Sequence, residues 1–131
     1  MPEIRIVLRL VFAVAVIAVA VLSLLPRDSV PSIGVSDKYE HLAAYAVLAA
    51  NAWMAFPTRR AALWLMLLLP LMSVALEFAQ TLVPGRSGEA ADALVSALGA
   101  YLLLVPMLLC RGAAPLGKRR GARAGNASNG A

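Results

Sequence analysis

The sequence predicts an all-α membrane protein with four transmembrane helices and both termini in the cytoplasm. Three observations lead to this prediction: the composition, the length of the apolar blocks and the placement of the basic residues. Hydrophobic residues make up 61% of the chain's 131 residues and charged residues only 15%, which is well outside the balance of a soluble domain. The apolar blocks run for about 20 residues, long enough to cross the hydrocarbon core of a bilayer as helices.

The first predicted span covers residues 4–25 and consists almost entirely of Val, Ala, Leu and Ile. Arg5 and Arg9 at its start resemble the charged region of a signal peptide. The apolar run then continues past any small-residue cleavage site, so we expect a retained anchor helix. The segment that follows, PRDSVPSIGVS, contains two prolines and a glycine and is predicted to be a loop.

The other three spans are predicted at residues 37–56, 61–83 and 90–110. Pro70 is expected to kink the third helix, and Pro84 and Gly85 suit the two central positions of a type II turn before the fourth. Residues 1–111 are therefore predicted to form one four-helix membrane domain. Residues 112–131 are basic and rich in Gly and Ala, and we expect them to form a disordered cytoplasmic tail.

The basic residues indicate which way the helices cross the membrane. Four spans place the N-terminus, the second loop and the tail on one side, with nine of the twelve basic residues: Arg5, Arg9, Arg59, Arg60, Arg111, Lys118, Arg119, Arg120 and Arg123. The other side has three: Arg27, Lys38 and Arg86. Because Lys and Arg are enriched in cytoplasmic segments, both termini are predicted to be cytoplasmic. The net charge of +5 then reflects topology and contact with anionic lipid rather than nucleic acid.

Polar residues gather where this topology places the outer side of the membrane. At about 100° per residue, three helices each present one polar face: Asp37, Lys38, His41 and Tyr45 on the second, Ser73, Glu77, Gln80 and Thr81 on the third, and Glu89, Asp92, Ser96 and Gly99 on the fourth. We expect these faces to meet, so that His41, Glu77 and Asp92 line one cavity with Lys38 and Arg86 at its mouth.

Most of these residues also have a structural explanation. The structural roles are a helix cap for Asp37, extension to the interface for Lys38, packing for Tyr45 and Gly99, hydrogen bonds between helices for Gln80 and Ser96, and a turn near lipid phosphates for Arg86. His41 and Glu77 favour a functional role instead, because ionisable groups at membrane depth are costly and usually face a cavity or a partner. One histidine with scattered carboxylates is a weak signal for a metal site, so no metal or other cofactor is expected.

Two ordered motifs, DKYEHLAAYAVL and EFAQTLVPGRSGEAADALVSALGA, resemble the VanZ-like family of small bacterial membrane proteins. The signature of that family runs D-K-x-x-H-x-x-x-Y-x-x-L, then E-x-x-Q, P-G-R and D-x-x-x-N-x-x-G. The matching positions lie within residues 33–105 and are Asp37, Lys38, His41, Tyr45, Glu77, Gln80, Arg86, Asp92 and Gly99. Ser96 stands where the family usually has Asn, and a hydroxyl offers fewer hydrogen-bonding sites than an amide.

The resemblance implies a protein of the bacterial cell envelope, in the inner membrane, related to glycopeptide (teicoplanin) resistance. It implies no particular reaction. We expect an anionic amphiphile, such as a lipid-linked phosphate or cell-wall intermediate, to bind at Asp37, Lys38, His41, Tyr45, Glu77, Gln80, Arg86, Asp92 and Ser96. Two alternatives stay open: a purely structural polar network, and an intramembrane phosphate or acyl transferase or hydrolase with His41 as base beside Asp37 or Glu77.

Overall fold

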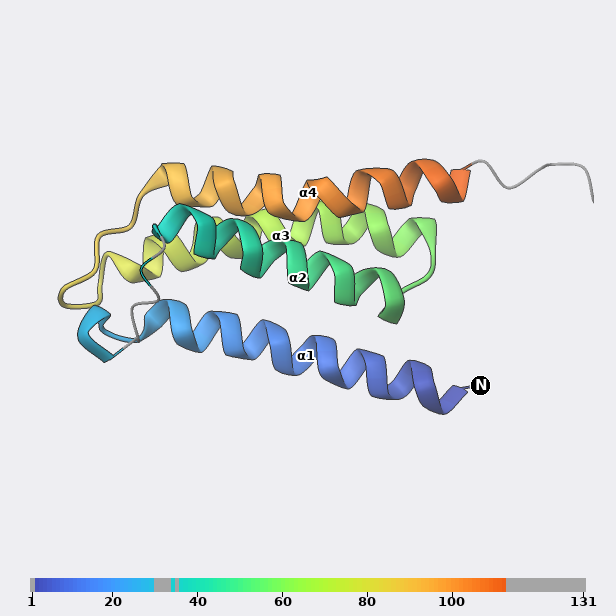
Figure 1. The fold of residues 1–131 in the computed structure, drawn as a ribbon, viewed down its shortest axis with the longest axis horizontal. Coiled ribbons are helices and arrows are strands. Elements are labelled where there is room, and N and C mark those ends of the chain that lie inside the picture. The colour runs from blue at the N-terminus through green and yellow to red at the C-terminus, as the bar shows by residue number, and fades with distance from the viewer. Residues whose placement is uncertain (1, 30–33, 35, 113–131) are drawn as a thin grey trace, which may run out of the picture.

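The computed structural model describes residues 2–29, 34 and 36–112, and its long helices lie side by side along one axis (Figure 1). They are α1 (Pro2–Leu24), α2 (Asp37–Ala55), α3 (Arg59–Gln80) and α4 (Ala90–Gly112), with a short 3-10 helix, η1 (Arg27–Ser29), after α1. No strand occurs among the described residues, so the all-α prediction is confirmed for them. The tail predicted to be disordered lies outside the described residues from position 113 onward.

The four predicted spans coincide with the four helices to within about three residues at each end. α3 ends earlier than predicted, at Gln80, because the chain turns soon afterwards. The backbone N–H of Arg86 donates to the carbonyl of Val83 over 3.2 Å, and Gly85 has a φ of +76°. A positive φ at the third position of a turn defines type II, so the predicted turn is confirmed. α3 continues through Pro70.

Three of the helices, α1, α3 and α4, are long and apolar enough to cross a membrane. α2 is not among them, since its first turn carries Asp37, Lys38 and Glu40. Large apolar side chains are exposed along the outer surfaces of all four helices, for example Leu10, Val47, Leu67 and Leu102. Exposed apolar surface on this scale is expected of helices that face lipid, and it identifies the chain as a membrane protein.

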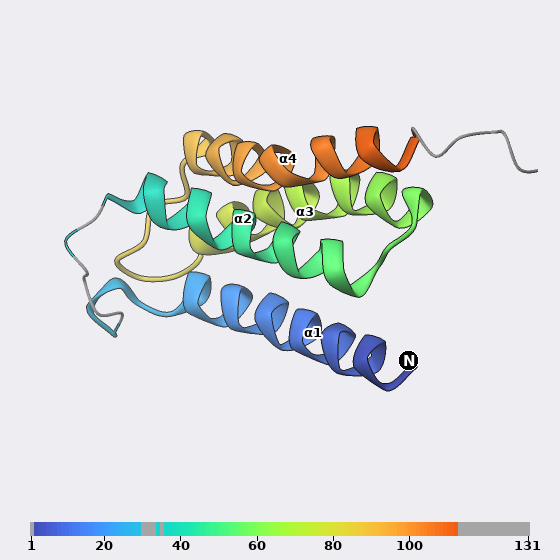
Figure 2. The ribbon, with the colours of Figure 1, turned by 45° about the vertical axis from the view of Figure 1, so that its right-hand side comes forward.

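The apolar core lies between α2, α3 and α4, where α2 packs most extensively against α4 (Figures 1 and 2). Leu48, Leu104 and Met107 are almost fully buried there, together with several alanines. Small side chains let helices approach closely in a membrane, where packing rather than water drives association. The core fills the part of the bundle away from the polar end, which leaves that end for the site.

α1 lies along the outside of α2 (Figure 2), and none of its most apolar stretch is fully buried. Its N-terminal half is held to the end of α2 by aromatic contacts. The rings of Phe12 and Phe56 meet edge to face with 5.4 Å between centroids, and the guanidinium of Arg9 lies 5.6 Å from the centroid of Phe56. These are favourable geometries for aromatic and cation–π pairs, so α1 belongs to the bundle rather than standing apart from it.

α2 and α4 come into backbone contact at Gly99. A Cβ added to Gly99 would meet the carbonyl oxygen of Leu42 in α2. This confirms the predicted close-packing role of Gly99. Because Leu42 follows His41 directly in the chain, the same contact places His41 beside the first turns of α4.

We expect Gly99→Val to lower the free energy of unfolding by about 1–3 kcal/mol, because the added carbons must displace the backbone of α2. The measurement is unfolding in mixed detergent micelles, followed by circular dichroism. Ala91→Leu adds three carbons at an exposed position of the same helix and serves as the control. Equal stability of the two variants would show that α2 and α4 do not meet at Gly99.

Candidate functional site

The polar residues lie at one end of the bundle because successive helices run in opposite directions. The start of α2, the end of α3 and the start of α4 therefore meet at the end that also carries the α3–α4 connection (Figure 1). Glu77, Gln80, Asp92 and Ser96 are buried there, none of them more than 6% exposed. Buried ionisable side chains in a helical membrane bundle need partners, and their contacts define the candidate site.

His41 lies between two buried carboxylates, and we call His41, Glu77 and Asp92 the acidic triad. The Nε2 atom of His41 is 3.8 Å from Oε1 of Glu77 and 3.9 Å from Oδ2 of Asp92. One nitrogen or oxygen atom from each of the three residues lies within 4.8 Å of the other two, close enough for the group to share a metal ion. These residues, one from each of three helices, therefore come together as predicted, but they do not line one cavity: His41 lines one of the two pockets described below, Glu77 lines the other and Asp92 lines neither.

Neighbouring groups fix the orientation of the triad. His41 Nδ1 lies 3.2 Å from Ser96 Oγ, in a hydrogen bond whose direction depends on the imidazole tautomer. The backbone N–H of Glu89 donates to Oε2 of Glu77 over 3.0 Å. Lys38 Nζ lies 3.6 Å from Oδ1 of Asp92 and 3.3 Å from Oε2 of Glu89, so it pairs on the α4 side of the cluster. Each member of the triad is thus held by at least one other side chain or backbone group.

Several buried polar atoms in this region make no hydrogen bond among the described residues: Tyr45 OH, Ser73 Oγ, Glu77 Oε1 and Asp92 Oδ1. Leaving a buried donor or acceptor unsatisfied costs about 1–3 kcal/mol, and more for a charged group. Native proteins contain few such atoms, and each calls for a functional or structural explanation. Their concentration around the triad favours a site that takes a ligand over a closed structural network.

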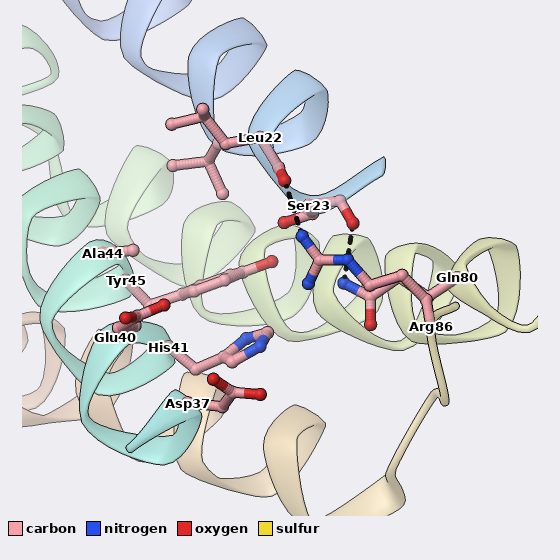
Figure 3. A pocket seen from close by; sticks show the side chains of 10 residues that line it. Leu22, Ser23, Asp37, Glu40, His41, Ala44, Tyr45, Gln80 and Arg86 are labelled. Carbon is pink, nitrogen blue, oxygen red and sulfur yellow. Dashed lines mark hydrogen bonds between the residues drawn. The ribbon is translucent and has the colours of Figure 1, made fainter. Parts of the chain in front are cut away.

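A pocket of about 170 Å³ opens beside His41, between α1, α2 and the end of α3 (Figure 3). Its lining consists of Val19, Leu22, Ser23, Asp37, Glu40, His41, Ala44, Tyr45, Gln80 and Arg86. His41 both lines this pocket and contacts the buried carboxylates behind it. The pocket therefore joins an open polar surface to the triad through one imidazole.

Arg86 and Gln80 connect the site to the C-terminal end of α1. Arg86 donates from Nε to the carbonyl of Leu25 over 2.9 Å and from Nη2 to the carbonyl of Leu22 over 3.0 Å. Gln80 donates from Nε2 to the carbonyl of Ser23, also over 3.0 Å. The last carbonyls of a helix have no partner within the helix, so these side chains supply the missing donors. The guanidinium lies between the end of α1 and the imidazole of His41 (Figure 3).

The structure places the residues predicted from the sequence in two groups. Five line the pocket, namely Asp37, His41, Tyr45, Gln80 and Arg86, and three are buried behind His41, namely Glu77, Asp92 and Ser96. Lys38 was expected at the mouth beside Arg86, but it does not line the pocket and pairs with Glu89 and Asp92 instead. Lys38 follows Asp37 directly, so its side chain is rotated by about 100° around the axis of α2 relative to that of Asp37. This rotation turns Lys38 toward α4.

Sequence reasoning left Glu40 and Gly88 out of the site, and it placed Glu89 on a polar face without giving it a role there. Glu40 lines the pocket, and Glu89 holds both Lys38 and Glu77. Gly88 lets this connection pass close to α3, since a Cβ there would meet the backbone carbonyl of Glu77. The glycine in PGRSGE was a usable signal for such a close approach. The backbone carbonyls at the end of α1 that bind Gln80 and Arg86 could not be predicted, because every residue has such a carbonyl.

Comparisons of the chain with family models, with curated proteins and with solved structures gave no match. The chemistry of the site follows from its own residues. An imidazole facing two carboxylates can bind a cation or exchange a proton, and a guanidinium at a pocket wall can donate to an anion.

We expect Arg86→Ala to release the end of α1 and to lower the free energy of unfolding by about 2 kcal/mol, because two charge-assisted hydrogen bonds are lost. Spin labels on cysteines placed at Ser29 and Leu82, in a Cys110→Ser background, report this separation by pulsed electron resonance. The distance distribution should be narrow in the parent and broad in Arg86→Ala. Arg60→Ala removes an exposed arginine at the other end of α3 and should leave the distribution narrow. An unchanged distribution in Arg86→Ala would contradict this role.

Proposed function

We propose that this chain is a VanZ-like integral membrane protein of the bacterial cell envelope that binds an anionic amphiphile in the pocket beside His41. The observation that supports the proposal is the convergence of the two motifs. Residues from DKYEH, from E-x-x-Q, from P-G-R and from the start of α4 meet at one end of the bundle. A signature whose members share one site is better explained by a common ligand than by four separate packing needs.

All four helices cross the membrane in this proposal, with both termini in the cytoplasm of the inner membrane. α2 is less apolar than the other three helices because of its first turn and of His41 and Asn51, and His41 faces the triad rather than lipid. The N-terminus of α1 and the end of α4 lie at the same end of the bundle (Figure 1). Nine of the twelve basic residues fall on that side by sequence, which supports a cytoplasmic location for both ends.

The pocket residues indicate the chemistry of the ligand's head group. Two of the guanidinium nitrogens of Arg86 donate to carbonyls of Leu22 in α1 and of Leu25 just after it, and the third, Nη1, has no acceptor among the described residues. This nitrogen suits a phosphate or carboxylate oxygen. Asp37 and Glu40 line the same pocket, so a matching head group also offers hydroxyl or amide donors. A lipid-linked sugar or peptide intermediate of the cell wall combines these features.

The apolar part of the ligand has two surfaces available. Val19, Leu22 and Ala44 form the apolar wall of the pocket. A second hollow of about 460 Å³ lies between α3 and α4, with Val74, Phe78 and Leu94 around it and Glu77 at its polar edge. Both hollows border the acidic triad, at the end of the bundle that the topology places in the outer leaflet. An amphiphile in that leaflet reaches the site without crossing the membrane.

The orientation is tested by labelling intact cells with a membrane-impermeant thiol reagent. Single cysteines at Ser29 and Ser87, in a Cys110→Ser background, should react because the proposed topology places them outside. A cysteine at Ser128 should react only after the membrane is permeabilised. Labelling of Ser128 alone in intact cells would reverse the orientation and place the pocket in the cytoplasmic leaflet.

The ligand is tested by filling the pocket. Ala44→Phe adds a ring at the pocket wall, whereas Ala43→Phe adds the same ring to the exposed neighbouring position. We expect Ala44→Phe to reduce co-purified lipid, identified by native mass spectrometry, by about tenfold or more, which corresponds to 1.4 kcal/mol of binding. Teicoplanin susceptibility of cells expressing the two variants at matched levels should change in parallel.

The same lipid measurement separates the alternatives. Wild-type lipid content and susceptibility in Ala44→Phe would contradict ligand binding in the pocket and leave a structural network. His41→Ala distinguishes binding from catalysis. Retained lipid together with a lost turnover of that lipid would assign His41 a catalytic role as base, in place of a binding role alone.

A further inference from the structure

The acidic triad brings two buried carboxylates together around one imidazole. Glu77 and Asp92 are each only 6% exposed. Lys38 is 3.6 Å from Asp92, but its side chain is about half exposed and it also pairs with Glu89. In the part of the chain that the structure describes, no Lys or Arg forms an ion pair with Glu77. Two buried carboxylates that face the same imidazole repel each other unless a positive group lies between them.

The atoms that face one another within the triad indicate where that positive group belongs. Oε1 of Glu77 is buried and has no hydrogen-bond donor, and it faces His41 Nε2 at 3.8 Å. Oδ2 of Asp92 faces the same nitrogen at 3.9 Å. Both separations are too long for hydrogen bonds. Two carboxylate oxygens and one imidazole nitrogen thus lie close together, and no hydrogen bond joins the nitrogen to either oxygen.

We propose that His41, Glu77 and Asp92 bind a divalent first-row transition-metal ion, with Zn²⁺ as the leading candidate. Ligand atoms about 2.0–2.2 Å from one zinc ion are roughly 3.3–3.6 Å from each other in tetrahedral geometry. The triad atoms lie within 4.8 Å of one another, so small side-chain rotations bring them to the ion. Three protein ligands leave one position for water or a bound ligand, as in catalytic zinc sites.

The groups around the triad match those that usually support a metal ligand. A metal-bound histidine is normally oriented by a hydrogen bond at its other ring nitrogen, and Ser96 occupies that position on Nδ1 of His41. The second oxygen of Glu77 accepts from the backbone of Glu89, which leaves Oε1 for the ion. These contacts fix the ring and one carboxylate before any ion arrives.

The mixture of ligand atoms selects the class of metal. Mg²⁺ and Ca²⁺ prefer sites made entirely of oxygen atoms, whereas the triad contributes an imidazole nitrogen. Zn²⁺ accepts imidazole together with carboxylates, and Mn²⁺ is the next candidate because two of the three ligands are carboxylates. The inference does not rest on the proposed lipid ligand, since metal binding is a property of the triad itself.

The test is zinc binding to the full chain in detergent, purified without a polyhistidine tag and stripped with a chelator. Isothermal titration with ZnCl₂ should give one site per chain. His41→Ala, Glu77→Gln and Asp92→Asn should each weaken binding by at least about tenfold, and Ser96→Ala by about tenfold. Glu40→Gln removes a nearby pocket carboxylate outside the triad and should bind zinc as the parent does.

A second measurement covers the case in which a triad variant fails to fold. Zinc K-edge absorption of the parent loaded with one equivalent should show only nitrogen and oxygen neighbours at about 2.0 Å, with the scattering of one imidazole. An absence of saturable binding in the folded parent would overturn the proposal. So would a spectrum without imidazole, or a loss of affinity in Glu40→Gln as large as in Glu77→Gln. Lipid content of the parent, measured with and without zinc, reports separately on the proposed function.

Discussion

The contact between Gly99 of α4 and the backbone of Leu42 in α2 sets the separation of the helices that carry Asp92 and His41. A side chain at position 99 would push the two helices apart at the level of the triad. The distances from His41 to Asp92 and to Ser96 depend directly on this approach, and the pairing of Lys38 with Asp92 follows from it. In a membrane, where no water competes for buried polar groups, such spacing decides whether those groups satisfy one another.

The bundle divides its interior between two kinds of packing. Away from the site, Leu104 and Met107 are completely buried among alanines, and this half needs no polar partner. At the other end, burial is combined with carboxylates, an imidazole and hydroxyls that are only partly satisfied. A sequence selected for stability alone would fill this end with apolar residues too. The unsatisfied atoms are therefore the strongest sign that the polar end acts on something outside the chain.

Much of the fold follows from the sequence, because helix length, apolar blocks and the Pro84-Gly85 turn are local properties. The meeting of His41 with Glu77 and Asp92 was also predictable, since helical periodicity gives the direction of each side chain. Periodicity does not say which neighbour a long side chain reaches. Lys38 therefore pairs with residues at the start of α4, which the sequence did not predict. Arg86 binds backbone carbonyls at the end of α1, and because every residue has a carbonyl, the sequence cannot mark these as partners. The proposed metal site was not predicted for the same reason. The sequence shows one histidine with scattered carboxylates, and only the fold brings their atoms together.

The hydrogen bonds from Arg86 to α1 also have a consequence for the order in which the protein is assembled. α1 is made before the other three helices, yet Arg86 donates to carbonyls at its C-terminal end from 61 and 64 residues further along the chain. Until α3 and the following turn are in place, that end of α1 depends on lipid head groups and water for hydrogen bonds. The C-terminal end of α1 is thus among the last parts of the bundle to gain its hydrogen bonds. The pocket wall closes only when Arg86 and Gln80 bind the end of α1, which is also the step that completes the bundle. A chain that lacks these residues therefore has no complete pocket.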